Sequence, residues 1–305
     1  MTESVRIIFV PGMKPKPPER IHRQVLGRCM RAGLERVDPG AAAPLRDGAR
    51  CLTAAAWNHA FYRRHRNIEL DKRSIERILE ESEPSNRDIV DIEAFARRKT
   101  RILLRMGHAA PLFSSLFARR SMRLTVTETH RYLMNWGGIA RVVRDIVRSA
   151  LLDAWSAGEQ VLLIGHSLGS VIAYDTLWEL SHGERRENGR VSLFMTLGSP
   201  LASPMILRGV QGARLSGRKR FPEIVDRWQN FSARGEITAL HPRMGPHYGE
   251  MVELGSLKAL QDCTGFYNHY RDRGRLDVHT SYGYLITRPV AESIAGWLRT
   301  ANTVG

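Results

Sequence analysis

Short apolar runs and amphipathic stretches alternate along this chain. The apolar runs predict strands buried on both faces, and they lie at 5–10, 161–164, 191–197 and 227–233, with weaker examples at 51–57 and 266–270. Residues 139–157 place apolar side chains at three- and four-residue steps, which predicts an amphipathic helix. Further helices are expected at 20–36 and 289–298. This alternation is typical of an α/β fold with a mostly parallel central sheet and helices on both faces.

The stretch 67–125 breaks this alternation, because it is charged and contains no run of strand type. Its spacing of apolar residues predicts two helices, at 71–83 and 89–104. We therefore interpret 67–125 as a helical cap or lid inserted into a core domain that is formed by 1–66 and 126–305.

The most apolar part of this cap is 102–118, and arginines stand on both sides of it. As a lid it could face a lipid or an acyl chain. It could equally pack on the body of the protein, and Pro111 favours packing because it would interrupt a long surface helix.

The clearest chemical signal is Gly165-His166-Ser167-Leu168-Gly169, which directly follows the buried run at 161–164. The serine of a Gly-x-Ser-x-Gly segment sits on a strained turn between a strand and a helix, and this turn projects its hydroxyl out of the sheet. The flanking residues must be small, because the strand and the helix pass close together there. Ser167 is therefore predicted to be a nucleophile if a base lies beside it.

A serine nucleophile needs a base, and the base usually needs a carboxylate that fixes its tautomer and stabilises its cation. In an open α/β sheet such groups gather at the carboxyl ends of the strands. His279, ahead of the closing helix, is the expected base, and Glu236, just after a predicted strand, is the expected acid. Asp262, Asp272 and Asp277 remain alternatives for the acid.

These motifs resemble the α/β-hydrolases, and more narrowly the lipases and esterases that carry Gly-His-Ser-Leu-Gly. Other matching segments are Val10-Pro11-Gly12, Leu197-Gly198-Ser199-Pro200, Trp228-Gln229-Asn230-Phe231 followed by an acid, and His279 followed by Ser281-Tyr282. The resemblance covers about 1–13 and 130–300 and leaves the cap unmatched. Two positions depart from the family: proline stands in the first turn where many members have histidine, and glutamate stands where aspartate is commoner.

The resemblance implies an oxyanion hole as well as an α/β-hydrolase fold. One donor would be the backbone N–H of Leu168, directly after the nucleophile. The other would be Met13 or Gly12, because Pro11 has no N–H to donate. The implied activity is a serine hydrolase that cleaves small-molecule or lipid esters of carboxylic acids through an acyl-enzyme, with no metal and no organic cofactor.

Two other functions fit the same residues. An acyltransferase or a thioesterase would use the same triad with another acceptor or leaving group. A non-catalytic binding protein on a hydrolase scaffold would instead use the basic N-terminal half of the chain.

The charge of the chain is uneven. Its formal net charge is +15, and residues 1–150 contain 29 basic against 16 acidic residues, whereas 151–305 contain 17 against 15. Such a surface attracts anionic lipid or nucleic acid, so peripheral contact with an anionic membrane is one option. The sequence has no helix-turn-helix, RNP or zinc-finger signature for nucleic acid.

Length and composition limit the remaining choices. With 305 residues, of which 43% are hydrophobic, the chain suits one large domain with an insertion. Its three widely spaced cysteines argue against a disulfide framework or a zinc site. We see no signal peptide and no apolar run long enough to span a membrane, so a cytoplasmic location is expected.

Overall fold

Six parallel strands form the central sheet of this protein, in the order β2-β1-β3-β4-β5-β6. The computed structural model describes residues 4–46, 49–107, 120–183, 189–236 and 241–303. Within them the strands are β1 (Val5–Val10), β2 (Leu52–Ala54), β3 (Gln160–His166), β4 (Leu193–Leu197), β5 (Arg227–Ser232) and β6 (Ala259–Thr264). A separate antiparallel pair consists of β7 (Arg271–Asp272) and β8 (Arg275–Leu276).

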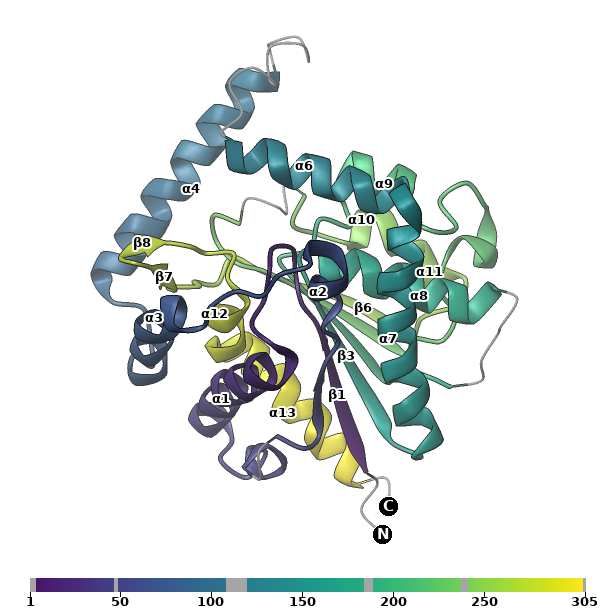
Figure 1. Ribbon diagram of the computed structural model, residues 1–305, viewed down its shortest axis with the longest axis horizontal. Coiled ribbons are helices and arrows are strands. Elements are labelled where there is room, and N and C mark those ends of the chain that lie inside the picture. The colour runs from purple at the N-terminus through teal and green to yellow at the C-terminus, as the bar shows by residue number, and fades with distance from the viewer. Residues whose placement is uncertain (1–3, 47–48, 108–119, 184–188, 237–240, 304–305) are drawn as a thin grey trace.

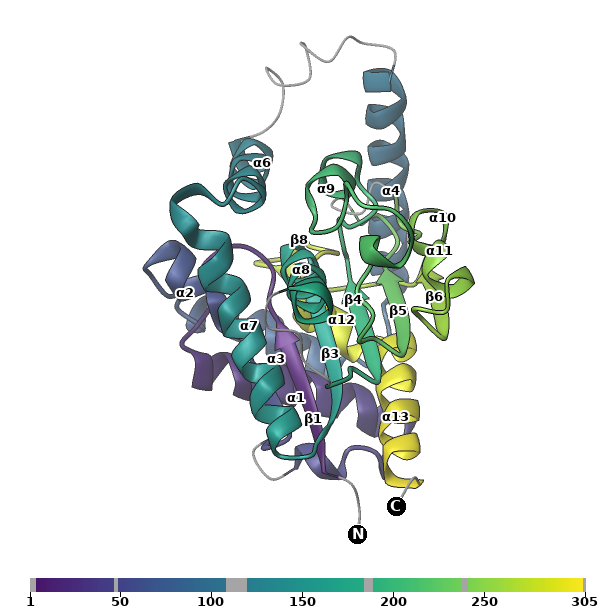
Figure 2. The ribbon, with the colours of Figure 1, turned by 90° about the vertical axis from the view of Figure 1, so that its right-hand side faces the viewer.

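Helices cover both faces of this sheet, so the chain has an α/β fold. On one face lie α1 (Glu19–Val37), α12 (Ser281–Ile286) and α13 (Arg288–Thr303), and on the other lie α7 (Ile139–Ser156) and α8 (Leu168–His182) (Figure 1 and Figure 2). The remaining α-helices are α2 (Trp57–Tyr62), α3 (Glu69–Glu80), α4 (Asn86–Gly107), α6 (Arg120–Leu133), α9 (Pro204–Gly209), α10 (Gly245–Tyr248) and α11 (Glu250–Glu253). None of the helices in the described ranges combines the length and the apolar character that crossing a bilayer requires.

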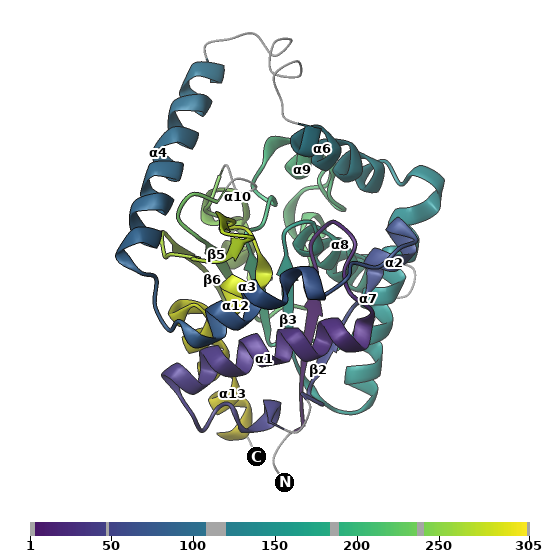
Figure 3. The same cartoon turned by 60° about the vertical axis from the view of Figure 1, so that its left-hand side comes forward.

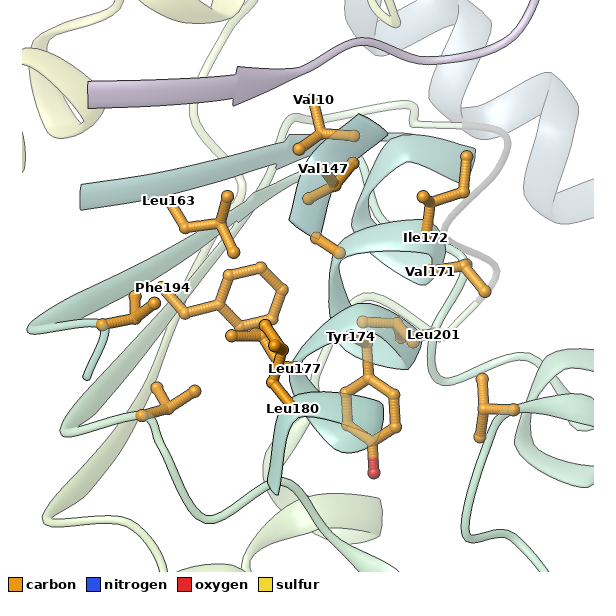
Figure 4. Packing of buried hydrophobic residues seen from close by; sticks show 14 of the residues in the cluster. Val10, Val147, Leu163, Val171, Ile172, Tyr174, Leu177, Leu180, Phe194 and Leu201 are labelled. Carbon is orange, nitrogen blue, oxygen red and sulfur yellow. The ribbon is translucent and has the colours of Figure 1, made fainter. Parts of the chain in front are cut away.

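Alternating side chains of the strands divide the core into two layers. Along β1, Ile8 and Val10 join the layer of α7 and α8, whereas Ile7 and Phe9 join the layer of α1 and α13. Figure 4 shows the first layer, in which side chains of the strands and of these two helices pack together. Because both faces of the inner strands are covered, their sequences are continuously apolar rather than alternating.

This burial explains which strands the sequence reveals. The predicted strands are confirmed to within a few residues at 5–10, 161–164, 191–197 and 227–233, and the weaker one at 51–57 is confirmed as the shorter β2. The strand expected at 266–270 is wrong: that segment contains no strand, and the edge strand β6 ends before it. No residue of β6 is fully buried, so no apolar run marks it in the sequence.

The described part of 67–125 contains helices joined by short loops, and no strand. The helices predicted at 71–83 and 89–104 are confirmed as α3 and α4, with bounds that differ by a few residues. α3 packs Ile75 and Ile78 into the core layer of α1, whereas α4 extends beyond the carboxyl ends of the strands (Figure 3). The division into a core and a cap stays a prediction.

The first turn of α4 is tied to the body by a buried carboxylate. Asp88 is 1% exposed and contacts Arg77 of α3 at 3.1 Å and Arg271 of β7 at 2.8 Å. These contacts hold the start of α4 beside the carboxyl edge of the sheet. The side chains of 102–118 lie outside the described part of the chain, so the lid also stays a prediction.

The strand β3 and the helix α8 cross in close contact near this edge. A Cβ at Gly165 would lie 2.5 Å from the Cα of Ser170, and a Cβ at Gly169 would overlap the carbonyl oxygens of Val10 and Pro11. Only glycine fits at both positions, because the backbone cannot yield as a flexible side chain would. The two glycines therefore let α8 begin directly against the ends of β1 and β3.

We expect Gly169→Ala to lower the free energy of unfolding by about 1–3 kcal/mol, since the added methyl group would push α8 away from β1. Urea denaturation measures this change. Gly296→Ala is the matched control, because a Cβ there meets only the end of Arg299 at 3.9 Å. This control should leave stability unchanged or raise it by up to about 1 kcal/mol. Equal effects of the two variants would contradict the tight crossing.

Candidate active site

Ser167 occupies a strained turn between β3 and α8. Its backbone angles are φ 52° and ψ −129°, and a non-glycine residue rarely adopts such a positive φ. Such a conformation costs about 1–3 kcal/mol and persists only where the surroundings impose it. Here the Ser167 N–H donates to Leu197 O at 3.0 Å, and the Ser167 carbonyl accepts from the N–H and Oγ of Ser170 at 2.9 and 2.6 Å. Both backbone polar groups of Ser167 are therefore hydrogen-bonded, and its hydroxyl remains available for chemistry.

His279 lies beside this hydroxyl. Its Nε2 is 2.9 Å from Ser167 Oγ, although 112 residues separate the two in sequence. His166 Nε2 donates to the His279 carbonyl oxygen at 2.6 Å, and the His279 N–H donates to Asp277 Oδ1 at 3.1 Å. The backbone carbonyl and N–H of His279 are thus both hydrogen-bonded, which fixes the loop ahead of α12 and keeps the imidazole in place.

Glu236 completes a chain of hydrogen bonds. It follows β5, is 2% exposed, and places Oε1 2.9 Å from His279 Nδ1. Its second oxygen accepts from the hydroxyl of Tyr284 at 2.7 Å, and that hydroxyl accepts from the Ala233 N–H at 3.1 Å. The carboxylate is therefore fixed in orientation from two sides, with Nδ1 of His279 as one of its partners.

Gly198 makes room for this contact. Its φ is +55°, and a Cβ there would lie 2.8 Å from Glu236 Oε2 and 3.1 Å from His279 Nδ1. A larger residue would be strained in the backbone and would also press on the bond between acid and imidazole. In the sequence, Gly198 stands out only within the segment Leu197-Gly198-Ser199-Pro200 that resembles the α/β-hydrolases, and Tyr284 carries no signal.

The three alternative carboxylates lie in other environments. Asp262 of β6 accepts from Asn230 Nδ2 and from two backbone N–H groups at 2.8–3.0 Å. Asp277 accepts from the backbone N–H of His279 and from Thr280 Oγ1 at 2.8 Å, so it supports the loop rather than the ring. Asp272 belongs to β7 and borders the neighbouring cavity. The structure thus brings Glu236 to the imidazole.

The protonation of the two neighbouring imidazoles differs. Burial disfavours the cation of His279, but the charge of Glu236 and its hydrogen bond outweigh burial and raise the pKa of His279 above 6.5. Burial, together with the nearby His279, lowers the pKa of His166 well below 6.5, so His166 stays neutral. His166 can then serve as a permanent N–H donor to the His279 loop, whereas His279 can exchange a proton with Ser167.

The turn after β1 lies against the nucleophile. A Cβ at Gly12 would be 2.8 Å from Ser167 Cβ, so this backbone approaches as closely as glycine allows. Asn58 Nδ2 donates to the carbonyls of Gly12 and Lys14 at 2.8 and 3.0 Å. Among the described residues, no acceptor is hydrogen-bonded to the N–H of Gly12 or Met13. Their role as oxyanion donors with Leu168 stays a prediction, and Asn58 was not anticipated from the sequence.

A cavity of about 190 Å³ opens beside Ser167 and His279. Its walls come from the loop after β1, from the segment before α3, and from the strands and loop that precede α12. This volume is below the roughly 300–1,000 Å³ of pockets that enclose drug-sized ligands. In the described ranges, no group of three or more His, Cys, Asp or Glu side chains could hold a metal ion.

Comparison of the chain with protein-family models, with curated proteins and with solved structures gave no match. What the site can do therefore follows from its own geometry. A hydroxyl, an imidazole and a buried carboxylate in one hydrogen-bonded chain can move a proton from Ser167 Oγ to His279 and stabilise the resulting cation.

We expect Glu236→Gln to lower the pKa of His279, because it removes the charge that raises this pKa and leaves the burial that lowers it. Titration of the imidazole by NMR measures the change. Asp277→Asn is the matched control, since this carboxylate contacts the backbone of His279 and not its ring, and its charge raises the pKa of His279 less than Glu236 does. A larger drop in Asp277→Asn than in Glu236→Gln would mean that the acid is misassigned.

Proposed function

We propose that this protein is a serine hydrolase with an α/β-hydrolase fold, which cleaves carboxylic esters through an acyl-enzyme. The observation that carries the proposal is the continuous contact from Ser167 Oγ through His279 to Glu236, with both distances at 2.9 Å. This contact starts at a serine whose backbone is strained and whose hydroxyl borders a cavity. Strained residues persist where the surroundings impose them, and functional sites are the commonest such places.

In the first half of the reaction, Ser167 Oγ attacks the ester carbonyl carbon while His279 Nε2 takes the hydroxyl proton. Glu236, hydrogen-bonded to Nδ1, stabilises the imidazolium that forms. The carbonyl oxygen becomes an oxyanion, for which the N–H groups of Leu168 and of Met13 or Gly12 are the proposed donors. His279 then protonates the leaving alcohol, and the acyl group stays on Ser167.

In the second half, water enters and His279 takes one of its protons as the water oxygen attacks the acyl carbon. The tetrahedral intermediate collapses, the carboxylic acid leaves, and His279 returns the proton to Ser167 Oγ. These steps need no residues other than Ser167, His279, Glu236 and the oxyanion donors. The small cavity supports a short acyl or alcohol group at the reacting bond.

The position of each group along the fold supports the α/β-hydrolase assignment. The nucleophile follows β3, the acid follows β5, and the histidine precedes α12, in the chain order serine, acid, histidine. All three meet at the carboxyl edge of a parallel sheet, where open α/β folds hold their ligands. An acyltransferase or a thioesterase would use the same steps with another acceptor or leaving group.

Labelling by a fluorophosphonate probe tests the nucleophile. We expect wild type to be labelled and Ser167→Ala to be unlabelled, with a loss of ester hydrolysis of about 10⁶-fold. Ser199→Ala is the matched control, because Ser199 also follows a strand but its Oγ is bonded to Ser170 Oγ at 2.6 Å. Equal labelling of wild type and Ser167→Ala would reject Ser167 as the nucleophile.

The pH profile tests the base. His279 must be neutral to accept a proton, and its pKa in the folded protein is raised above 6.5. We therefore expect kcat/KM for an ester to fall on the acid side with a midpoint above pH 6.5. In Glu236→Gln the residual activity should show a lower midpoint. A wild-type midpoint below 6.5 would contradict the assigned roles.

A further inference from the structure

Lys16 stands in the wall of the cavity that contains Ser167 and His279. It belongs to the stiff loop after β1, with Pro15 before it and Pro17 after it. Proline fixes its own backbone and restricts the residue that precedes it, so this loop has little conformational freedom.

Contacts with the rest of the protein fix this loop further. The Arg66 N–H donates to the Lys16 carbonyl at 3.0 Å, and the Lys14 N–H donates to the hydroxyl of Tyr62 at 3.0 Å. The backbone of Lys16 is therefore held beside the nucleophile, and its side chain is partly buried. A group so placed is preorganised for any molecule that enters the cavity.

The Lys16 ammonium has no partner of its own. Among the described residues, no carboxylate lies within ion-pair distance of it and no oxygen accepts a hydrogen bond from it. A partly buried charge without a partner is unusual, because burial of an unpaired ion is costly. Lys16 is only partly buried, so this cost is partial, and an anion bound in the cavity would relieve it.

Two of the three acidic residues that line the cavity are engaged elsewhere. Asp71 forms two bonds with Arg66, at 2.6 and 2.5 Å, and Asp277 accepts from the His279 loop at 3.1 Å. Asp272, the third, forms no ion pair with Lys16, and its Oδ1 is buried without a hydrogen-bond partner among the residues that the structure describes. Lys14, which is exposed, adds a second positive charge at the mouth of the cavity.

We infer that Lys16 selects esters that carry an anionic group, a carboxylate or a phosphate, on the acyl or the alcohol part. This inference rests on the hydrolase function proposed above and names its substrate class. The anion would lie in the cavity of about 190 Å³ and pair with the Lys16 ammonium, while the ester carbonyl lies at Ser167. Lys16 would then act in binding and positioning, and not in the proton transfers.

The electrostatics of the loop support this assignment. Burial, with the charges of Lys14 and Arg66, lowers the pKa of Lys16 to about 8 despite the opposing effect of Asp71 and Asp277. The folded protein therefore disfavours this cation relative to water. A bound anion would relieve that penalty, so ammonium and anion would stabilise each other in the complex.

Two matched pairs of esters test the inference. Monoethyl adipate and ethyl hexanoate share a six-carbon acyl chain and differ in a terminal carboxylate. Acetoxybenzoate, with its carboxylate para to the ester, and phenyl acetate place the difference on the leaving group. Hydrolysis is followed by proton release at constant neutral pH. The pair whose two esters are hydrolysed at different rates shows whether the enzyme recognises an anion on the acyl part or on the alcohol part.

Lys16→Met removes the charge and keeps the length of the side chain. We expect it to lower kcat/KM for the anionic ester of the discriminating pair by about 10- to 100-fold, since a hydrogen bond to a charged group contributes that much. The neutral ester should change by less than about threefold, because it makes no contact with the ammonium and is affected only through the small influence of Lys16 on the pKa of His279. Thermal unfolding should be unchanged or shift to a higher temperature, because the variant loses no partner of the ammonium and removes the cost of its burial.

Lys258→Met is the control for net charge. Lys258 is exposed, precedes β6 at the amino edge of the sheet, and pairs with Asp226 at 3.5 Å, far from the cavity in the fold. This variant should leave both members of each pair unchanged.

Three outcomes would overturn the inference. If wild type and Lys16→Met show no preference for the anionic ester in either pair, the inference fails and the hydrolase function stands. If Lys16→Met slows both members of a pair equally, Lys16 has a structural or general role and no part in selection. If wild type hydrolyses none of the four esters, the proposed function fails and the inference falls with it.

Discussion

The turn that carries Ser167 is the constraint on which the rest of the site depends. Its φ of 52° is unfavourable for serine, yet the turn is bonded at both backbone groups and enclosed by the crossing of β3 and α8. Gly165 and Gly169 allow that crossing, and α8 then fixes the direction of the serine side chain. A strain of about 1–3 kcal/mol is thus offset by packing, and it leaves a hydroxyl at the edge of the sheet.

The parallel sheet brings the partners of this hydroxyl to the same edge. Parallel strands end together, so the segments after β3 and β5 reach the same edge on either side of β4, although they are far apart in sequence. The segment ahead of α12 adds His279, and the buried Tyr284 of α12 holds the oxygen of Glu236 that faces away from the ring. Buried residues of the core therefore stabilise the fold and also orient the polar groups of the site.

Much of this arrangement could be predicted from the sequence. Strands buried on both faces leave continuous apolar runs, and the Gly-x-Ser-x-Gly segment marks its turn by the need for small residues. The edge strand β6 could not be found this way, since none of its residues is fully buried. Glu236 could be proposed but not separated from Asp262, Asp272 and Asp277, because the choice depends on which loop faces the imidazole.

The residues that support the site could not be predicted from the sequence, for a related reason. Asn58 and Tyr284 act through contacts with residues 44 to 51 positions away, and Lys16 acts through a cavity that exists only in the folded chain. No local pattern distinguishes them from ordinary surface or core residues. Long-range packing decides their role, and that packing follows from the sheet topology rather than from any motif.

The most direct test of the account is to find where the acyl group resides during turnover. The protein would be mixed with p-nitrophenyl acetate, quenched in acid within the first turnover, digested with trypsin and analysed by mass spectrometry. The account predicts one acetyl group on the peptide 149–185, located by fragmentation at Ser167. Rapid hydrolysis with the acetyl group on another residue, or with no acylated peptide at all, would contradict it.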